Sequence, residues 1–200
     1  NSMSIGAPAT NPASDLELKL PATVGSAGQV LKNNGTAGTL EFGYGIEFDN
    51  WMVNTGFEAE NTFITSNWER MDQVGFAKIG NGMTQSSGVF TFPSTGIWNI
   101  HFGVSLYKGG TAVRFAGGHI YVSTNGSGGT FHESSTTYTN IYNQSGNSAY
   151  GSTSTDYTLD VTNTTNCVCK FHVYASGNIG FVGHDTRNCT YATFTRIGDT

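Results

Sequence analysis

The residues that could carry catalysis are dispersed along the chain. No His or Cys pair has the spacing of a metal site or a nucleophile motif, and no Asp-rich loop fits calcium. The pair Asp156 and Asp160 is better explained as solvated strand residues than as a general acid and base. A triad assembled in space stays open, because triads are defined by geometry. We therefore expect no enzyme, no metal and no other cofactor. The histidines are His101, His119, His132, His172 and His184.

Binding chemistry is concentrated in residues 130–157, where aromatic side chains alternate with Ser, Thr, Asn and Gly. This composition is typical of binding surfaces, in which rigid rings supply contact area and small polar groups adapt to the ligand. Aromatic faces beside amides and hydroxyls suit sugars. We expect Tyr138, Tyr142, Asn143 and Tyr150 in outer loops that bind the ligand. The alternative is that these tyrosines fill an edge strand with their hydroxyls in water.

A second candidate loop spans residues 107–115 and contains two cations. Lys108 and Arg114 are placed among small residues and glycines, so their charges would be available to an anionic glycan. They are equally consistent with ordinary solvated charges.

The composition excludes several classes of partner. Charged residues make up only 12% of the chain and the net charge is −5, so there is no basic surface for nucleic acid. No run approaches the roughly 20 apolar residues of a membrane span, and we expect no membrane insertion. Cys167, Cys169 and Cys189 indicate small reduced thiols, although a disulfide between Cys189 and one of the other two stays open.

Two regions differ in patterning. Residues 1–45 are rich in glycine, proline and small residues and cannot bury a core alone, which indicates an extended stem or a linker. From residue 46 onward, short β-rich runs separated by turn residues predict a single all-β domain at 46–200, a sandwich or a barrel. The clearest strand, 96–107, alternates large apolar and smaller side chains. Further strands are expected at 51–55, 75–79, 89–92, 118–124, 157–161, 167–174, 179–182 and 190–197.

The segment from Phe90 through Gly96 to Phe102 resembles the signature strand of the tumour necrosis factor-like jelly rolls. The similarity is greatest to the globular head of the q subcomponent of complement: Phe90, Gly96, Trp98 and Phe102 fit, with Ile100 at a position where Phe is usual. The resemblance implies a two-sheet jelly-roll sandwich that assembles as a tight trimer and binds ligands with its outer loops.

The same resemblance gives a role to the other face of strand 96–107. If Trp98 and Phe102 fill the sandwich, the pleat turns Asn99 and His101 outward. In the resembled family that face looks toward the trimer axis, so we expect Asn99 and His101 there, bonded to their symmetry copies or to water or an ion. Three histidines near an axis would also make assembly sensitive to acid.

The N-terminal region carries a second resemblance. Residues 18–35, closing at Leu40 to Gly43, are similar to the connecting segment before the heads of many bacteriophage tail-fibre proteins. Together the resemblances imply the trimeric head of a phage fibre or appendage, made in the host cytoplasm and carried on the virion. It would bind a host-cell surface glycan or protein, and other virion proteins through its arm. The alternatives are a purely structural virion knob or capsid-decorating protein, and a secreted complement-like or lectin-like module.

Overall fold

The computed structural model describes residues 17–26, 29–34, 36–76 and 78–200, and it divides into two compact units, 1–45 and 46–200. In the N-terminal unit, β1 (Val30–Asn33) pairs antiparallel with β2 (Leu40–Gly43). Val24 in this unit is 93% exposed and Leu20 67%. The expected arm thus contains a two-stranded ladder without a core of its own, while residues 1–16 of that arm lie outside the described residues.

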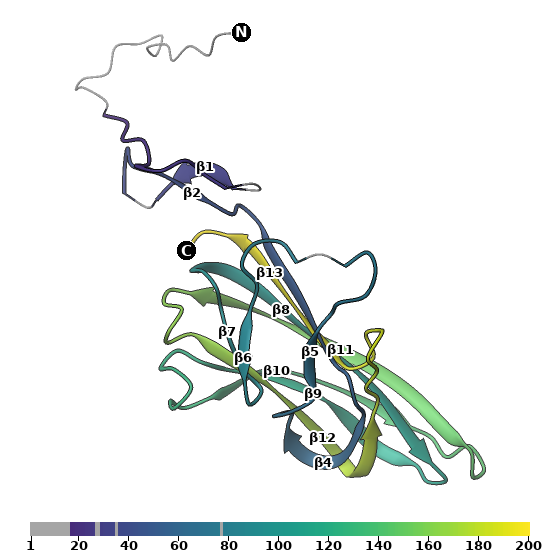
Figure 1. Cartoon of the computed structure of the whole chain (residues 1–200). Helices are drawn as coiled ribbons and strands as arrows, with labels where there is room; N and C mark the ends of the chain where they lie inside the picture. Colours follow the sequence, from purple (N-terminus) through teal and green to yellow (C-terminus); the bar gives the residue numbers. More distant parts are fainter. Residues whose placement is uncertain (1–16, 27–28, 35, 77) are drawn as a thin grey trace, which may run out of the picture. The chain divides into compact units, whose positions relative to one another are not determined.

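The second unit, which we call the head, is an all-β sandwich of two layers (Figure 1). Its strands are joined by antiparallel ladders, and the described residues contain no helix. Layer I has the order β5 (Trp68–Arg70), β3 (Glu47–Val53), β13 (Tyr191–Gly198), β8 (Gly96–Gly109) and β11 (Ser148–Val161).

Layer II is built around the long strand β12. Its order is β10 (His132–Ile141), β9 (Val113–Ser123) and β12 (Val168–Phe181); β4 (Phe57–Phe63) and β7 (Val89–Thr91) pair with the other edge of β12, and β6 (Thr84–Ser86) pairs with β7. A short ladder joins the layers where Gly180 pairs with Tyr107 and Phe181 with Leu106.

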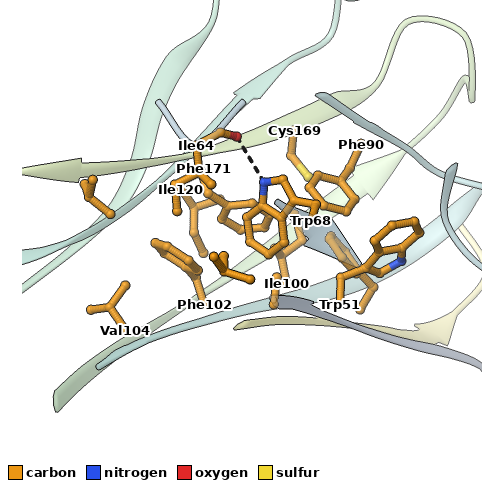
Figure 2. Packing of buried hydrophobic residues seen from close by; sticks show 14 of the residues in the cluster. Trp51, Ile64, Trp68, Phe90, Ile100, Phe102, Val104, Ile120, Cys169 and Phe171 are labelled. Atoms are coloured by element: carbon orange, nitrogen blue, oxygen red, sulfur yellow. Dashed lines mark hydrogen bonds between the residues drawn. The ribbon is translucent and has the colours of Figure 1, made fainter. Parts of the chain in front are cut away.

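The core lies between the layers, and strand β8 shows why. Its alternate side chains, from Trp98 to Leu106, are at most 1% exposed, which confirms the inward face expected from the sequence. Phe171 of β12 and Phe90 of β7 meet them from layer II, as Figure 2 shows. The buried indole of Trp68 donates its Nε1 hydrogen to the carbonyl oxygen of Ile64 at 3.0 Å, so its one polar atom is satisfied.

The predictions from the sequence need correction in three regions. Residues 75–79 form no strand in their described part; only Ile79 makes an isolated bridge, to Phe48. The strands expected at 167–174 and 179–182 are one strand, β12, which pairs with β4 on both sides of a register shift between Tyr174 and Ile179. Residues 130–157 are mostly the strands β10 and β11 rather than loops.

Hydroxyl side chains explain why residues 130–157 become strands. The hydroxyl of Ser135 on β10 bonds that of Thr155 on β11, and Thr137 bonds Thr153 in the same way. These pairs link the two layers along one side of the sandwich, where small hydroxyl side chains lie between the layers. The abundance of Ser and Thr in this segment therefore serves inter-layer packing.

Candidate functional site

One end of the head, here called the tip, comprises residues 107–114 and 141–150. It contains the β8–β9 and β10–β11 connections, which lie together at the end of the sandwich (Figure 1). Ser148 pairs with Gly109 and Ile141 pairs with Val113, so the two connections are held against adjacent strands. The structure therefore brings the two candidate loops predicted from the sequence to the same place.

Most of the predicted ligand-binding residues gather at the tip. Tyr142 is 70% exposed and Tyr150 is 74% exposed, with the Tyr150 ring centroid 6.1 Å from that of Tyr107. Asn143 lies next to Tyr142, and its Oδ1 accepts a hydrogen bond from Gly146 N at 3.5 Å. The Lys108 ammonium donates to the Asn178 carbonyl oxygen at 2.5 Å.

The expectation of outer loops is wrong for four of these residues, although their role in binding stays a prediction. Tyr138 lies in β10, Tyr150 in β11, Lys108 in β8 and Arg114 in β9. The strands extend farther than the turn residues suggested, since the ladders continue to the last residues before each connection.

Asn99 and His101 point away from the core on the outer face of layer I, and a strand of the same chain supplies their partner. Asp156 of β11 is opposite His101 in the ladder; its Oδ1 lies 3.0 Å from His101 Nδ1 and accepts from Asn99 Nδ2 at 3.3 Å. The second ring nitrogen of His101 lies 3.3 Å from the Tyr191 hydroxyl. Both side chains therefore have a partner inside one chain. Their place at a trimer axis stays a prediction.

The outer face of layer I also carries a shallow hollow of about 430 Å³. Gly103 lies at its floor, and the Tyr191 ring occupies the space beside it: a Cβ on Gly103 would lie 2.6 Å from that ring. Ser105, Ser152 and Ser154 line the hollow. The hollow is thus lined by these hydroxyls together with the Tyr191 ring.

The outer face of layer II is different, and we call it the aromatic face. It comprises Phe63, Phe115, His119, Tyr121, Tyr138, His172 and Tyr174, contributed by β4, β9, β10 and β12. Phe115 lies 5.5 Å from Tyr138 and 5.1 Å from Tyr174 between ring centroids, and His119 lies 5.2 Å from Tyr138. Arg114 connects this face to the tip, because its guanidinium lies 5.3 Å from the Phe115 centroid.

Charged groups at the aromatic face shift each other's pKa values. The hydrogen bond from the Tyr121 hydroxyl, 2.7 Å from Oε2 of Glu133, lowers the pKa of Glu133, and His119 adds to this effect. Burial and the same bond raise the pKa of Tyr121 to about 12. Burial, followed by the neighbouring His119, lowers the pKa of His172 to about 4, so His172 is neutral at pH 7. Burial also lowers the pKa of Lys170.

Two buried histidines of the aromatic face have unpaired ring nitrogens. His119 is 3% exposed and His172 is 8% exposed. Nε2 of His172 lies 2.7 Å from Asn61 Oδ1, but its Nδ1 has no hydrogen-bonding partner. Nδ1 of His119 lies 3.2 Å from Oε2 of Glu133, too poorly aligned for a hydrogen bond, and its Nε2 has no partner. Buried polar atoms usually have a hydrogen-bonding partner, so the unpaired ring nitrogens of His119 and His172 are exceptional.

Sequence reasoning missed the aromatic face because it treated the histidines as dispersed. The signal was present in two strands: His119 and Tyr121 alternate with core residues in β9, as Lys170, His172 and Tyr174 do in β12. What the sequence could not supply is the pairing of β9 with β12, in which His119 is opposite His172. The described residues contain no group of three His, Cys, Asp or Glu side chains suited to a metal ion.

No family model matches the chain, and no curated protein matches it. Among solved structures, Eiger TNF from S. frugiperda superimposes with a TM-score of 0.57 at 10% identity, covering 78% of this chain and 95% of that one. Murine APRIL at pH 5.0 gives a TM-score of 0.49 at 12% identity, covering 76% and 98%. The chain therefore has a tumour necrosis factor-like jelly-roll fold, as predicted, and at this identity the likeness concerns the fold alone.

Three further observations concern the cysteines and the membrane. Cys167 and Cys169 are buried and Cys189 is partly buried; all three are free thiols in this structure. Burial raises the pKa of the Cys169 thiol far above its usual range, as befits a small core side chain. Among the described residues, no helix has the length and apolar character needed to cross a membrane.

Proposed function

We propose that this chain is a non-enzymatic binding head of a bacteriophage fibre or virion appendage, which attaches to a glycan or protein of the host-cell surface. The observation that carries the proposal is the tip, where the exposed residues Tyr142 and Tyr150 are at the same end of the sandwich as Asn143, Lys108 and Arg114. Exposed aromatic side chains beside adaptable polar groups are the usual material of a recognition surface.

The proposal includes assembly as a homotrimer through the outer face of layer I, with Asn99 and His101 near the axis. The paired polar groups of this face support it, since polar side chains that already have a partner within one chain cost less to bury against a copy. Residues 1–45 would join the head to other virion proteins, in keeping with their resemblance to fibre connecting segments. The virion is then its location, after synthesis in the host cytoplasm.

The test is attachment of the purified, fluorescently labelled chain to a panel of bacterial cells, with solution mass measured in parallel. We expect a trimer that binds some strains, and Tyr142→Ala should reduce binding. The matched control is Ser127→Ala, an exposed turn residue that follows the opposite end of β9. A trimer that binds no cell would favour the structural virion knob, and a stable monomer at micromolar concentration would remove the support for a fibre head.

A further inference from the structure

We propose that the aromatic face is a second binding surface, separate from the tip, and that it takes uncharged sugar residues of a glycan. The inference rests on the proposed function, because a second ligand surface is useful to a module that attaches to cells. The observations behind it are independent of the tip: a cluster of rings on four strands, and three buried ring nitrogens of His119 and His172 that lack a hydrogen-bonding partner.

The rings supply a platform for stacking. Tyr138 is 47% exposed on β10, and its ring packs against those of Phe115 and His119. Among the described residues, β10 pairs with β9 at one edge and with no strand at the other. Phe115 and Tyr174 are partly exposed beside it. Because each ring is held by its neighbours, little side-chain freedom is lost when a ligand covers the platform. The apolar C–H faces of a pyranose ring suit such a surface, and its hydroxyls reach the surrounding polar groups.

The unpaired nitrogens indicate which polar groups the ligand brings. Nδ1 of His119 faces the Glu133 carboxylate, and Nε2 of His172 faces the Asn61 amide oxygen, so the ring protons are assigned to these two nitrogens. His119 Nε2 and His172 Nδ1 are then left as acceptors with no donor. Because both nitrogens are buried, the missing donor reaches them through a bridging water that a ligand hydroxyl holds at the surface, and not by direct contact with the ligand.

The charges favour a neutral ligand over an anionic one. Glu133, with its side chain 42% exposed, carries a carboxylate that has acceptor capacity beyond its bond to Tyr121. The Lys170 ammonium lies between two rings, 3.8 Å from the Phe63 centroid and 4.0 Å from that of Phe131. The face thus presents acceptors and a cation already engaged with aromatic rings. Sugar hydroxyls complement this set, whereas a uronate or sulfate would face the carboxylate.

The experiment measures binding of the full chain to immobilised dextran, mannan and galactan, with polygalacturonate as the acidic arm. Tyr138→Ala should weaken binding to a neutral polysaccharide by about tenfold or more, whereas Tyr138→Phe keeps the ring and most of the affinity. Tyr142→Ala at the tip is measured beside them to show which surface holds the sugar. The matched control is Ser127→Ala, an exposed turn residue outside the tip and the aromatic face, which should stay within about twofold of wild type. In the imidazole NMR spectrum, saturating sugar should shift the His119 and His172 signals.

Several outcomes would overturn the inference. One is that the chain attaches to cells but binds none of the neutral polysaccharides; the proposed function would then stand without the inference. Others are binding to polygalacturonate alone, and equal loss of sugar binding in Tyr142→Ala and Tyr138→Ala, which would place the sugar at the tip. Neutral sugar binding that is lost with Tyr138 in a chain that attaches to no cell would instead support the aromatic face and contradict the proposed function.

Discussion

The two outer faces of the sandwich are made from equivalent long strands, yet they differ in what their polar atoms contact. On layer I, Asn99 and His101 both find Asp156 on the neighbouring strand. On layer II, His119 and His172 each retain a buried nitrogen without a partner. Asn99 and His101 are thus paired within a single chain, whereas the two histidines of layer II have buried nitrogens that lack a partner, as does Asn50 Oδ1 on β3 of layer I. The difference separates a surface suited to packing from one suited to recognition.

The core between the layers fixes the two outer faces in place, so the largest loss in the free energy of unfolding is expected from a substitution in that core. Trp98 is fully buried, and its Nε1 donates to the Ser94 carbonyl oxygen at 3.2 Å. Trp98→Ala should lower the free energy of unfolding by about 3 to 5 kcal/mol, through lost burial and a cavity. Denaturant titration measures it, with Ser127→Ala as the control. A loss below about 1 kcal/mol would mean that the layers repack and the two faces are not independently fixed.

The core face of the sandwich was predictable from the sequence, but the side chains that meet on its two outer faces were not, because their contacts depend on strand pairing. Alternation in β8 identifies the core face directly, because the strand period of two is a local property. The contact of His119 with His172, and of Asn99 with Asp156, depends on which strands pair and in what register. That information is not local, so sequence reasoning placed Asn99 and His101 outward correctly but missed Asp156 as their partner.

Lowering the pH should destabilise the head through His172 on layer II. Because burial lowers the pKa of His172 from 6.5 to about 4, the unfolded chain takes up a proton before the folded one does. The contribution of this pKa shift to the free energy of unfolding is therefore complete above about pH 6.5. It is lost progressively as the pH falls toward 4, by at most about 3 kcal/mol. The other charged or titratable groups facing His172 are Glu133, whose pKa is lowered chiefly by its hydrogen bond from Tyr121, Lys170 and His119.

The matched variants for acid are His172→Gln, which keeps a donor toward Asn61, and His101→Asn on the other face. We expect His172→Gln to remove most of the loss between pH 6.5 and 4, and His101→Asn to leave it in place; thermal melts across this range report both. If instead His101→Asn abolished the acid response, the sensitive group would lie on layer I, as the trimer-axis prediction from the sequence implies.

Removing Asp156 tests whether layer I is satisfied within one chain. In Asp156→Ala, His101 and Asn99 lose the carboxylate that both contact. Because Asp156 is 57% exposed and water replaces it in part, we expect a loss of about 0.5 to 1.5 kcal/mol in the free energy of unfolding. Asp160→Ala, an exposed acid four residues along β11, is the control. An equal effect of both variants would show that the net charge of the strand matters and that the Asp156 contacts do not.

The smallest effect on stability is expected at the tip, where function and folding should separate. Tyr142 is 70% exposed and lies in the connection after β10, so it buries little apolar surface. Tyr142→Ala should stay within about 0.5 kcal/mol of wild type in denaturant titration, as is usual for surface substitutions, while attachment to cells weakens. Tyr150 is 74% exposed and its ring lies beside that of Tyr107, so Tyr150→Ala should behave in the same way with a slightly larger loss of stability. If the denaturation midpoint of Tyr142→Ala fell as far as that of Trp98→Ala, the Tyr142 ring would belong to the packed structure of the head, and the binding surface would have to be sought on the aromatic face alone.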